Sequence, residues 1–176
     1  MVEKTAIKFL VRRANAEDIA AAAEVHKQAF PRQTNSREWL DCVFRSFPKS
    51  QLFVAETGSE IVGLIFWTEK SGFRKEAVVE LEQIAVRPDH QDKGVGTELI
   101  NRSLPAVAEK IAERGAKVGT ILGNTRVDNQ ALNWYQRFGA EPVATIPGMF
   151  SADEVFLVIR DADVSKICSS VRKQLT

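Results

Sequence analysis

Residues 81–100 read LEQIAVRPDHQDKGVGTELI: an apolar strand pattern, a proline turn, and a helix that begins beside two glycines. Glycine inside a helix costs about 1 kcal/mol relative to alanine, so Gly94 and Gly96 require an explanation. A helix N-terminus presents unpaired N–H groups and the positive end of the helix dipole, which together attract anions. The two glycines therefore indicate either a simple strand-to-helix turn or a turn that lets a phosphate approach the backbone.

Two well-known phosphate loops do not fit this stretch. A dinucleotide fingerprint requires a third glycine three residues after the second, and Leu99 occupies that position. A P-loop requires lysine directly after its last glycine, whereas Lys93 precedes Gly94. The remaining pattern is Q-x-x-G-x-G, with Gln91 as its first residue.

Composition excludes several classes of protein. The chain has 176 residues, 44% of them hydrophobic and 27% charged, which is typical of one globular domain. A net charge of +1 argues against a dedicated nucleic-acid binder. Two cysteines and two histidines suggest neither a disulfide framework nor a metal site, and no apolar run is long enough to cross a membrane. We therefore expect a cytoplasmic protein that uses no metal and binds neither nucleic acid nor membrane.

Hydrophobic periodicity places strands and helices on both sides of the glycine turn. The first helix is expected to be capped by Asn15 together with Asp18 and ended by Pro31. Pro105 should kink or split the helix that follows the glycines, with Ser103 as a local cap. The remaining expected strands are 6–14, 51–57, 60–70, 76–86, 116–123, 141–146 and 154–160, and the remaining helices are 36–47, 94–114 and 129–138.

These elements predict a single domain over residues 1–160 with an α/β sheet and helices on its faces. Residues 161–176 form a C-terminal amphipathic helix or tail, with Val164, Ile167, Val171 and Leu175 at helical spacing. This segment either docks on its own domain or contacts a second copy. Both a monomer and a homodimer remain open.

Two motifs together resemble the GCN5-related N-acetyltransferases, the GNAT family. Gln91, Gly94 and Gly96 match the acetyl-CoA signature of that family, and Ala131, Tyr135 and Gly139 match its second signature further along the chain. Two positions depart from the family pattern. Asp128 occupies the usual asparagine position, with Asn129 directly after it, and Ala140 stands in place of phenylalanine.

The resemblance implies a mixed, mostly antiparallel central sheet with helices on both faces and a splayed, V-shaped slot for acetyl-CoA. A bulge should separate the strand before the glycine turn from its neighbour. The backbone of residues 84–86 would pair with the pantetheine arm, and backbone amides at the helix start would bind the pyrophosphate. The cofactor-binding residues implied in this way are Ile84, Ala85, Val86, Gln91, Asp92, Lys93, Gly94, Val95, Gly96, Thr97 and Asn129.

Acetyl transfer to an amine requires a base for the ammonium proton and an acid for the leaving thiolate. Glu80 and Glu82, two residues apart on a strand, are expected to share the face of Ile84 and to supply the base, with Gln83 on the opposite face. A solvated face or an ion pair is the alternative for both glutamates. Tyr135 stands where the family often places a tyrosine near the sulfur, and core packing is its alternative role.

The leading hypothesis is an N-acetyltransferase that moves acetyl from acetyl-CoA to a primary amine of a small molecule or protein, by direct attack in a ternary complex. One alternative is a non-catalytic acyl-CoA-binding module that senses the cofactor or regulates a partner. Another is a nucleotide-binding domain of a different α/β type, which would bind ATP or NAD. We expect residues 28–48 and 145–154 to select the acceptor, whose identity the sequence leaves open.

Overall fold

The computed structural model describes residues 9–70 and 72–172, which build one seven-stranded sheet in the order β1-β2-β3-β4-β5-β7-β6. Neighbouring strands are antiparallel except for β4 and β5, which are parallel. The strands are β1 (Leu10–Arg13), β2 (Ser50–Thr57), β3 (Glu60–Lys70), β4 (Glu76–Val86), β5 (Lys117–Arg126), β6 (Glu141–Ile146) and β7 (Glu154–Arg160).

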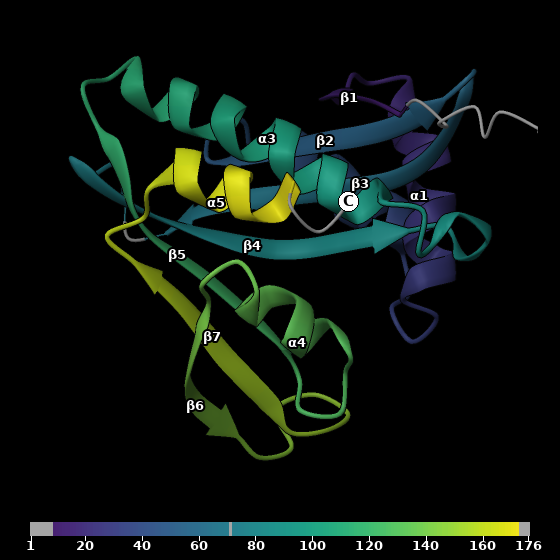
Figure 1. Cartoon of the computed structure of the whole chain (residues 1–176). Coiled ribbons are helices and arrows are strands. Elements are labelled where there is room, and N and C mark those ends of the chain that lie inside the picture. The colour runs from purple at the N-terminus through teal and green to yellow at the C-terminus, as the bar shows by residue number, and fades with distance from the viewer. Residues whose placement is uncertain (1–8, 71, 173–176) are drawn as a thin grey trace, which may run out of the picture.

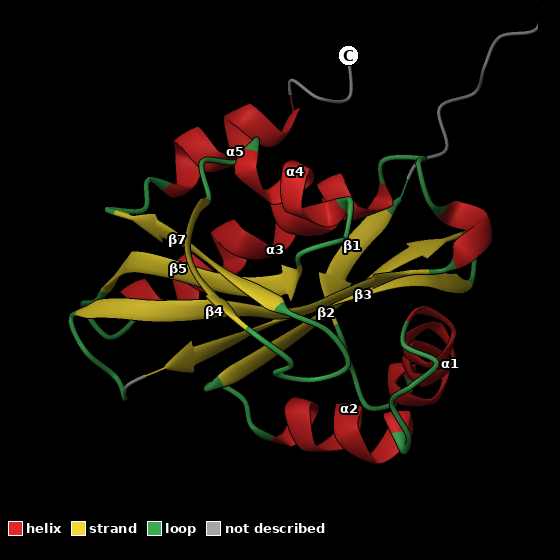
Figure 2. Cartoon of the chain, turned by 90° about the horizontal axis from the view of Figure 1, so that it is seen from below, coloured by secondary structure: helices red, strands yellow, loops and turns green. Residues whose placement is uncertain are grey.

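Helices cover both faces of the sheet, as Figure 2 shows. The helices α1 (Asp18–Ala29) and α2 (Ser36–Arg45) lie on one face, and α3 (Val95–Ala112), α4 (Ala131–Gln136) and α5 (Val164–Arg172) lie on the other. Side chains of β3 alternate between the two cores: Leu64 and Phe66 pack on the α1 face, whereas Ile65 and Trp67 pack on the α3 face. No helix within the described residues is long and apolar enough to cross a membrane.

The sheet splays open between β4 and β5. The two strands pair only from Glu76 to Glu80 on β4 and from Lys117 to Leu122 on β5, and beyond these residues they diverge (Figure 1). This mixed, mostly antiparallel sheet with a V-shaped gap confirms the expected fold class.

A bulge interrupts the pairing of β3 with β4, as expected. Phe66 lies opposite Gln83 and Trp67 lies opposite Leu81, which leaves Glu82 as an extra residue on β4. The extra residue shifts the alternation of side chains along the second half of the strand.

The start of α1 is fixed by two short-range interactions. The Asn15 side chain accepts a hydrogen bond from the Asp18 N–H at 3.1 Å, and Asp18 accepts one from the Asn15 N–H at 2.8 Å. This is the reciprocal capping pair expected from the sequence, although the regular helix begins only at Asp18. The helix ends at Ala29, just before Pro31.

The expected split of α3 at Pro105 is wrong, because the helix is continuous from Val95 to Ala112. Proline lacks the N–H that would bond the carbonyl oxygen of Asn101, four residues earlier. The thiol of Cys168, on α5, lies 3.9 Å from that carbonyl oxygen and offers it a weak donor. The Ser103 hydroxyl does not cap a new helix and instead accepts a hydrogen bond from the Trp67 indole N–H at 2.8 Å.

Other boundaries differ at the ends of elements. Strand β5 runs to Arg126 rather than residue 123, α2 stops at Arg45, and α4 is shorter than its pattern suggested. Helix α5 packs on α3, with Ile167, Cys168 and Val171 in the core. Residues 6–8 of the first expected strand and Leu175 of the tail lie outside the described residues. The domain boundary at residue 160 stays a prediction.

Candidate active site

The start of α3 has the backbone geometry of an anion site. Gly94 is its N-cap and adopts φ +85°, a left-handed conformation that favours glycine, and Asp92 adopts φ +57°. The Glu98 N–H is bonded within the helix, to the Gly94 carbonyl at 3.0 Å. The amides of the preceding turn, from Val95 to Thr97, have no intrahelical acceptor, and no described side chain caps the helix.

The turn between β4 and α3 is held by its own side chains. The Gln91 amide donates to the Val86 carbonyl at 3.2 Å, and Lys93 Nζ donates to the Asp89 carbonyl at 2.7 Å. Lys93, which directly precedes Gly94, therefore helps to hold the turn. Arg87 instead bonds Asp89 and an acidic side chain of β3, which fits a surface role.

The end of β4 exposes one backbone edge to the gap. The Arg87 N–H donates to the Val62 carbonyl on β3 at 2.9 Å. Backbone groups alternate sides along an antiparallel ladder, so Ala85 also faces β3, whereas Ile84 and Val86 face the gap left by β5. Of the three predicted pantetheine contacts, Ile84 and the Val86 N–H face the gap, the Val86 carbonyl is already bonded to Gln91, and the Ala85 side chain is buried in the opposite core.

Two glycines set the spacing around this helix start. A Cβ on Gly96 would meet the Trp134 ring at 3.6 Å and the Ile84 side chain at 3.7 Å, so the absent side chain leaves a narrow space between them. A Cβ on Gly63, in β3, would lie 2.9 Å from a Val95 side-chain carbon. Gly63 thus lets α3 pack directly on β3. The sequence interpretation missed it, although an isolated glycine inside a strand is a signal of close approach.

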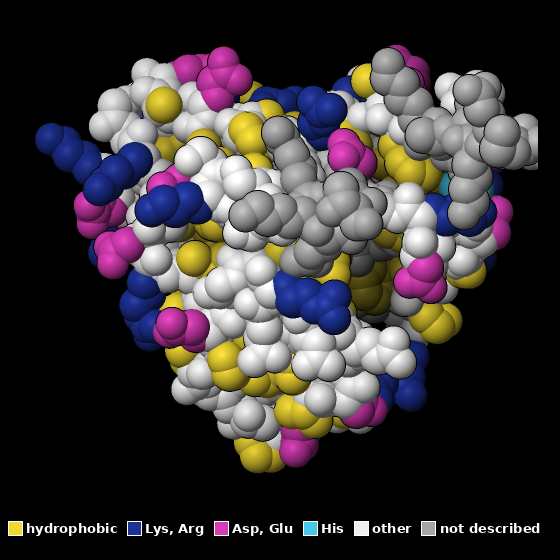
Figure 3. Space-filling view, in the orientation of Figure 1, with side chains coloured by type: hydrophobic (Ala, Val, Ile, Leu, Met, Phe, Trp, Pro, Cys, Tyr) yellow, Lys and Arg dark blue, Asp and Glu magenta, His cyan; other side chains and the backbone are white. Residues whose placement is uncertain are grey.

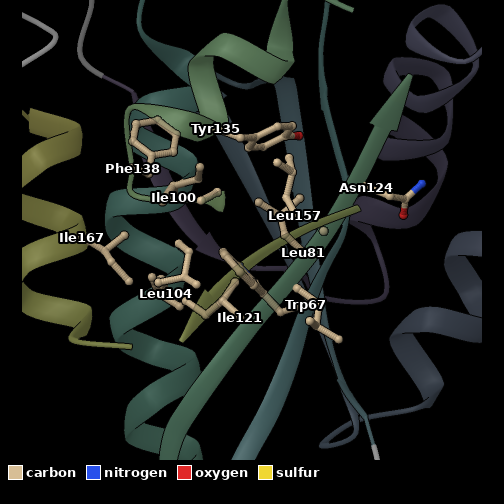
Figure 4. Close-up of a pocket in the computed structure, with 14 residues that line it drawn as sticks. Trp67, Leu81, Ile100, Leu104, Ile121, Asn124, Tyr135, Phe138, Leu157 and Ile167 are labelled. Carbon is tan, nitrogen blue, oxygen red and sulfur yellow. The ribbon is translucent and has the colours of Figure 1, made fainter. Parts of the chain in front are cut away.

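A cavity opens where β4 and β5 part (Figure 4). Its volume is about 40 Å³. Figure 3 shows a recess with hydrophobic side chains in it between the end of β4 and α4. The lining residues are Trp67, Leu81, Ile100, Leu104, Ile121, Leu122, Gly123, Asn124, Tyr135, Phe138, Ala140, Leu157, Ile159 and Ile167.

Tyr135 projects from α4 into this cavity (Figure 4). Its ring also packs with the Trp134 ring, at 5.2 Å between centroids, so the packing role and the site role are compatible. Burial raises the pKa of Tyr135 to about 12. The phenol is therefore protonated at neutral pH, and among described residues its hydroxyl has no protein hydrogen-bond partner.

The bulge corrects the predicted orientation of the glutamates. Glu80 pairs with Thr68 of β3. Because Glu82 is an extra residue in the strand, the Glu80 side chain lies on the same face of the sheet as Gln83, and Ile84 lies on the other face. Lys70 Nζ bonds Glu80 at 2.7 Å, the ion pair foreseen as the alternative, and this contact raises the pKa of Lys70.

Glu82, the bulge residue itself, also lies close to Thr68. Its carboxylate accepts a hydrogen bond from the Thr68 hydroxyl at 2.5 Å, and that hydroxyl lies 3.0 Å from the Ser50 hydroxyl. The two glutamates therefore belong to the α1 and α2 side of the sheet rather than to the cavity side.

A hydrogen-bond network behind the bulge is absent from the sequence interpretation. The side-chain oxygen of Gln83, Oε1, accepts a hydrogen bond from His26 Nε2 at 2.8 Å and one from the Trp39 indole N–H at 3.2 Å. His26 Nδ1 in turn lies 2.9 Å from the Ser36 hydroxyl, and burial lowers the pKa of His26. The neutral ring thus joins α1 and α2 to the bulged strand. Since these residues lie far apart in the sequence, no local pattern reveals the network.

Asn129 forms a hydrogen bond within its own turn. Its carboxamide oxygen accepts a hydrogen bond from the Ala131 N–H at 2.9 Å, at the start of α4. Asp128, in the usual asparagine position, is paired with Arg126 instead. The predicted contact of Asn129 with a ligand stays a prediction.

Together, the splayed sheet and the glycine-flanked helix start define an α/β protein with an uncapped helix N-terminus beside an apolar gap. The sequence pattern of the Acetyltransferase (GNAT) family matches residues 13–140, more than half of the chain. The chain therefore belongs to the GNAT acetyltransferase family.

Similar proteins carry the same family name or fold. An uncharacterized N-acetyltransferase of Methanocaldococcus jannaschii is 25% identical over 152 residues, which are 80% of this chain but 64% of the relative's length. The structure of Ard1 from Thermoplasma volcanium superposes with TM-score 0.70 and 18% identity, covering 88% of this chain and 99% of Ard1. An aminoglycoside 6'-N-acetyltransferase complexed with coenzyme A gives TM-score 0.70 and 15% identity, covering 88% of this chain and 98% of that enzyme.

Proposed function

We propose that this protein is an acetyl-CoA-dependent N-acetyltransferase that acetylates a primary amine by direct attack. One observation carries the proposal: the open amides of α3, the free edge of β4 and the Tyr135 hydroxyl meet at the gap between β4 and β5. Membership of the family and the coenzyme A in the aminoglycoside 6'-N-acetyltransferase structure support this choice of cofactor.

The residues at the gap fit coenzyme A in chemistry and in shape. The α3 amides and the Lys93 charge suit a pyrophosphate, and the Ile84 and Val86 backbone groups suit the amides of a pantetheine arm. The space that a side chain at Gly96 would fill lies beside Trp134, where the arm would enter. These residues would therefore place the far end of the arm beside Tyr135 and the β4 bulge.

Bound acetyl-CoA supplies an activated acetyl thioester. The Tyr135 hydroxyl, protonated and without a hydrogen-bond partner among the residues that the structure describes, donates a hydrogen bond or proton to the departing sulfur. Backbone amides near the bulge polarise the carbonyl. Holding the acetyl donor and the amine together accelerates the reaction, and this acceleration requires no covalent intermediate on the protein.

Glu82 is the proposed base, acting directly or through a water molecule. Its carboxylate stands at the bulge and is oriented by Thr68. Glu80 is tied to Lys70, so its charge is partly neutralised and it serves chiefly to hold the end of β3. This assignment places the acceptor amine on the α1 and α2 side, the region expected to select it.

A panel of primary amines incubated with acetyl-CoA and monitored for released thiol tests the function. We expect at least one amine to give turnover. Glu82→Gln should then lower kcat about 100-fold, with Glu80→Gln as the matched control that lowers it less than fivefold. Acetyl-CoA binding without turnover on any amine would favour the regulatory module, and binding of ATP or NAD in its place would contradict both.

A further inference from the structure

Glu154, at the start of β7, is a buried carboxylate that the proposed mechanism does not use. Only 6% of the residue is exposed, and its carboxylate accepts a hydrogen bond from the Asn124 amide at 3.0 Å. Arg126 lies opposite Glu154 in the register but gives its hydrogen bonds to Asp128, at 2.6 and 2.9 Å. Within residues 9–70 and 72–172 Glu154 forms no ion pair, although a buried carboxylate is normally paired with a cation.

The strand register places Glu154 on the acceptor side of the sheet. Glu80 pairs with Leu122 at the last point where β4 and β5 are joined, so both side chains lie on the α1 and α2 face. Asn124, two residues after Leu122, lies on that face as well, and its carboxamide points away from the apolar cavity (Figure 4). Glu154 bonds this carboxamide. Glu82 and Glu154 therefore lie on the same face, one on each side of the gap.

Trp39, on α2, adds an aromatic surface on the β4 side of the gap. Its indole N–H donates to the side chain of Gln83, the residue directly after Glu82, and 43% of Trp39 is exposed. Gln83 is held in turn by His26 and Gln33. The indole is therefore fixed near the proposed base, with part of its surface open to solvent. Such a ring packs on carbon chains, and its face attracts cations.

We propose that the acceptor is an aliphatic diamine, whose first amine reacts beside Glu82 and whose second, charged amine binds Glu154. Its carbon chain packs on the Trp39 ring. This inference rests on the proposed function, because the acetyl donor must first occupy the gap. The second amine gives Glu154 the cation that the described residues do not supply, in a charge-assisted hydrogen bond.

Transfer to a diamine requires no further reactant. The reacting ammonium loses one proton to Glu82 and one to the departing sulfur, by way of Tyr135. A carbon–nitrogen bond forms as the carbon–sulfur bond breaks. The products are the singly acetylated diamine, whose second amine keeps its charge, and coenzyme A.

Thiol release from acetyl-CoA with matched amines tests the second charge. Glu82 and Glu154 belong to strands two positions apart, roughly 10 Å, so the test uses diamines of about four to six carbon atoms and the amino alcohols of equal length. The best diamine should have a kcat/KM at least tenfold above that of its amino alcohol. Glu154→Gln, which can still accept from Asn124, should bring the diamine to the level of the amino alcohol. Asp128→Asn removes a carboxylate already paired with Arg126 and should retain the preference.

A second set of variants tests the Trp39 ring. Trp39→Ala should raise KM about tenfold for diamines and amino alcohols alike, with kcat within twofold. Trp39→Phe keeps an aromatic ring and loses the N–H that bonds Gln83, so its KM should stay near that of wild type. A KM as high as that of Trp39→Ala would contradict contact between ring and chain. Phe73→Ala, which removes an exposed ring between β3 and β4, is the control and should leave KM unchanged.

The possible results separate this inference from the proposed function. Turnover with equal kcat/KM for diamines and amino alcohols would overturn the diamine acceptor and leave acetyl transfer intact. No turnover of any amine would overturn both. If circular dichroism shows that Glu154→Gln does not fold, Ile146→Lys offers the carboxylate a cation from the opposite position on β6, where Ile146 is exposed. A preference that survives in either folded variant contradicts Glu154 as the site of the second charge.

Discussion

Tyr135 combines two properties at a single residue, a raised pKa and a hydroxyl that bonds no other side chain or backbone group within residues 9–70 and 72–172. Its pKa of about 12 means that the group is a donor across the physiological range. Tyr135→Phe keeps the ring packing with Trp134 and removes only the donor. We expect kcat to fall about 100-fold, with little change in acetyl-CoA affinity.

The pH dependence provides the check on Tyr135. Because the phenol loses its proton only near pH 12, the wild-type rate should not decline between pH 8 and 10 through this group. Two results would contradict the role of Tyr135 as the proton donor: a kcat of Tyr135→Phe equal to that of wild type, or a decline of the wild-type rate above pH 8 that disappears in this variant.

Gly63 shows how a glycine outside the site positions it. An added methyl group would lie 2.9 Å from Val95 Cγ1 and 3.2 Å from the Ala85 carbonyl oxygen, so α3 must move from β3. We expect Gly63→Ala to reduce the free energy of unfolding by about 1–3 kcal/mol, measured by urea denaturation. Gly123→Ala, also in a strand but with its nearest contact at 3.8 Å, is the control and should change it by less than about 0.5 kcal/mol.

At the scale of elements, two ion pairs of Arg12 join β1, α1 and β2. Arg12 binds Asp18 through both terminal nitrogens, at 2.6 and 2.9 Å, and also reaches Glu56 at 2.8 Å. The hydrogen bond from Arg12 lowers the pKa of Asp18 below its ordinary 3.8. Asp18→Asn should therefore cost about 2 kcal/mol at pH 7.

This cost should depend on pH in one direction. The folded state holds Asp18 ionised to lower pH than the unfolded state does, so the stabilisation is complete above about pH 4 and is lost as the pH falls below it. Denaturation at pH 7 and pH 2.5 measures the change. The control is Asp41→Asn, which removes the exposed ion pair with Arg45 and should cost less than about 1 kcal/mol at both pH values. If the stability difference between wild type and Asp18→Asn does not change with pH, the ion pair is not the source of that difference.

Elements with strong local signals were predicted well. The expected strands 51–57 and 60–70 form β2 and β3 and pair as a hairpin, with Gly58 between them at φ +62°. The continuity of α3 was missed because the helix packs on α5 and on several strands, whose residues lie far from Pro105 in the sequence. Tertiary contacts of this kind leave no trace in a local pattern.

The site was predicted in part, for the same physical reason. The two motifs indicated the helix start and Tyr135, since both depend on spacing along one segment. The predicted orientation of the Glu80 side chain was wrong. A one-residue bulge reverses the alternation of side chains between the two faces of a sheet, and the position of the bulge depends on how β4 pairs with β3. The Gln83–His26 network requires three elements to meet and was not predictable from any of them alone.

At the scale of the whole molecule, the splayed sheet creates both the gap and its two chemically different sides. The α3 side offers amides, an apolar cavity and the Tyr135 hydroxyl, and the α1 and α2 side offers carboxylates and the Gln83 network. An acyl donor and an amine acceptor could therefore reach the bulge from opposite faces. The central claim is that the glycine-flanked start of α3 binds the pyrophosphate of the donor.

Titration of acetyl-CoA into wild type, Gly94→Ala and Gly58→Ala tests that claim most directly. Both glycines have positive φ, +85° and +62°, so each substitution costs a similar 1–2 kcal/mol of backbone strain, roughly. Only Gly94 stands at the predicted pyrophosphate site. We expect wild type and Gly58→Ala to bind acetyl-CoA with the same Kd and Gly94→Ala to bind at least tenfold more weakly. A wild type that does not bind, or a Gly94→Ala variant with unchanged Kd, would contradict a pyrophosphate site at this helix start.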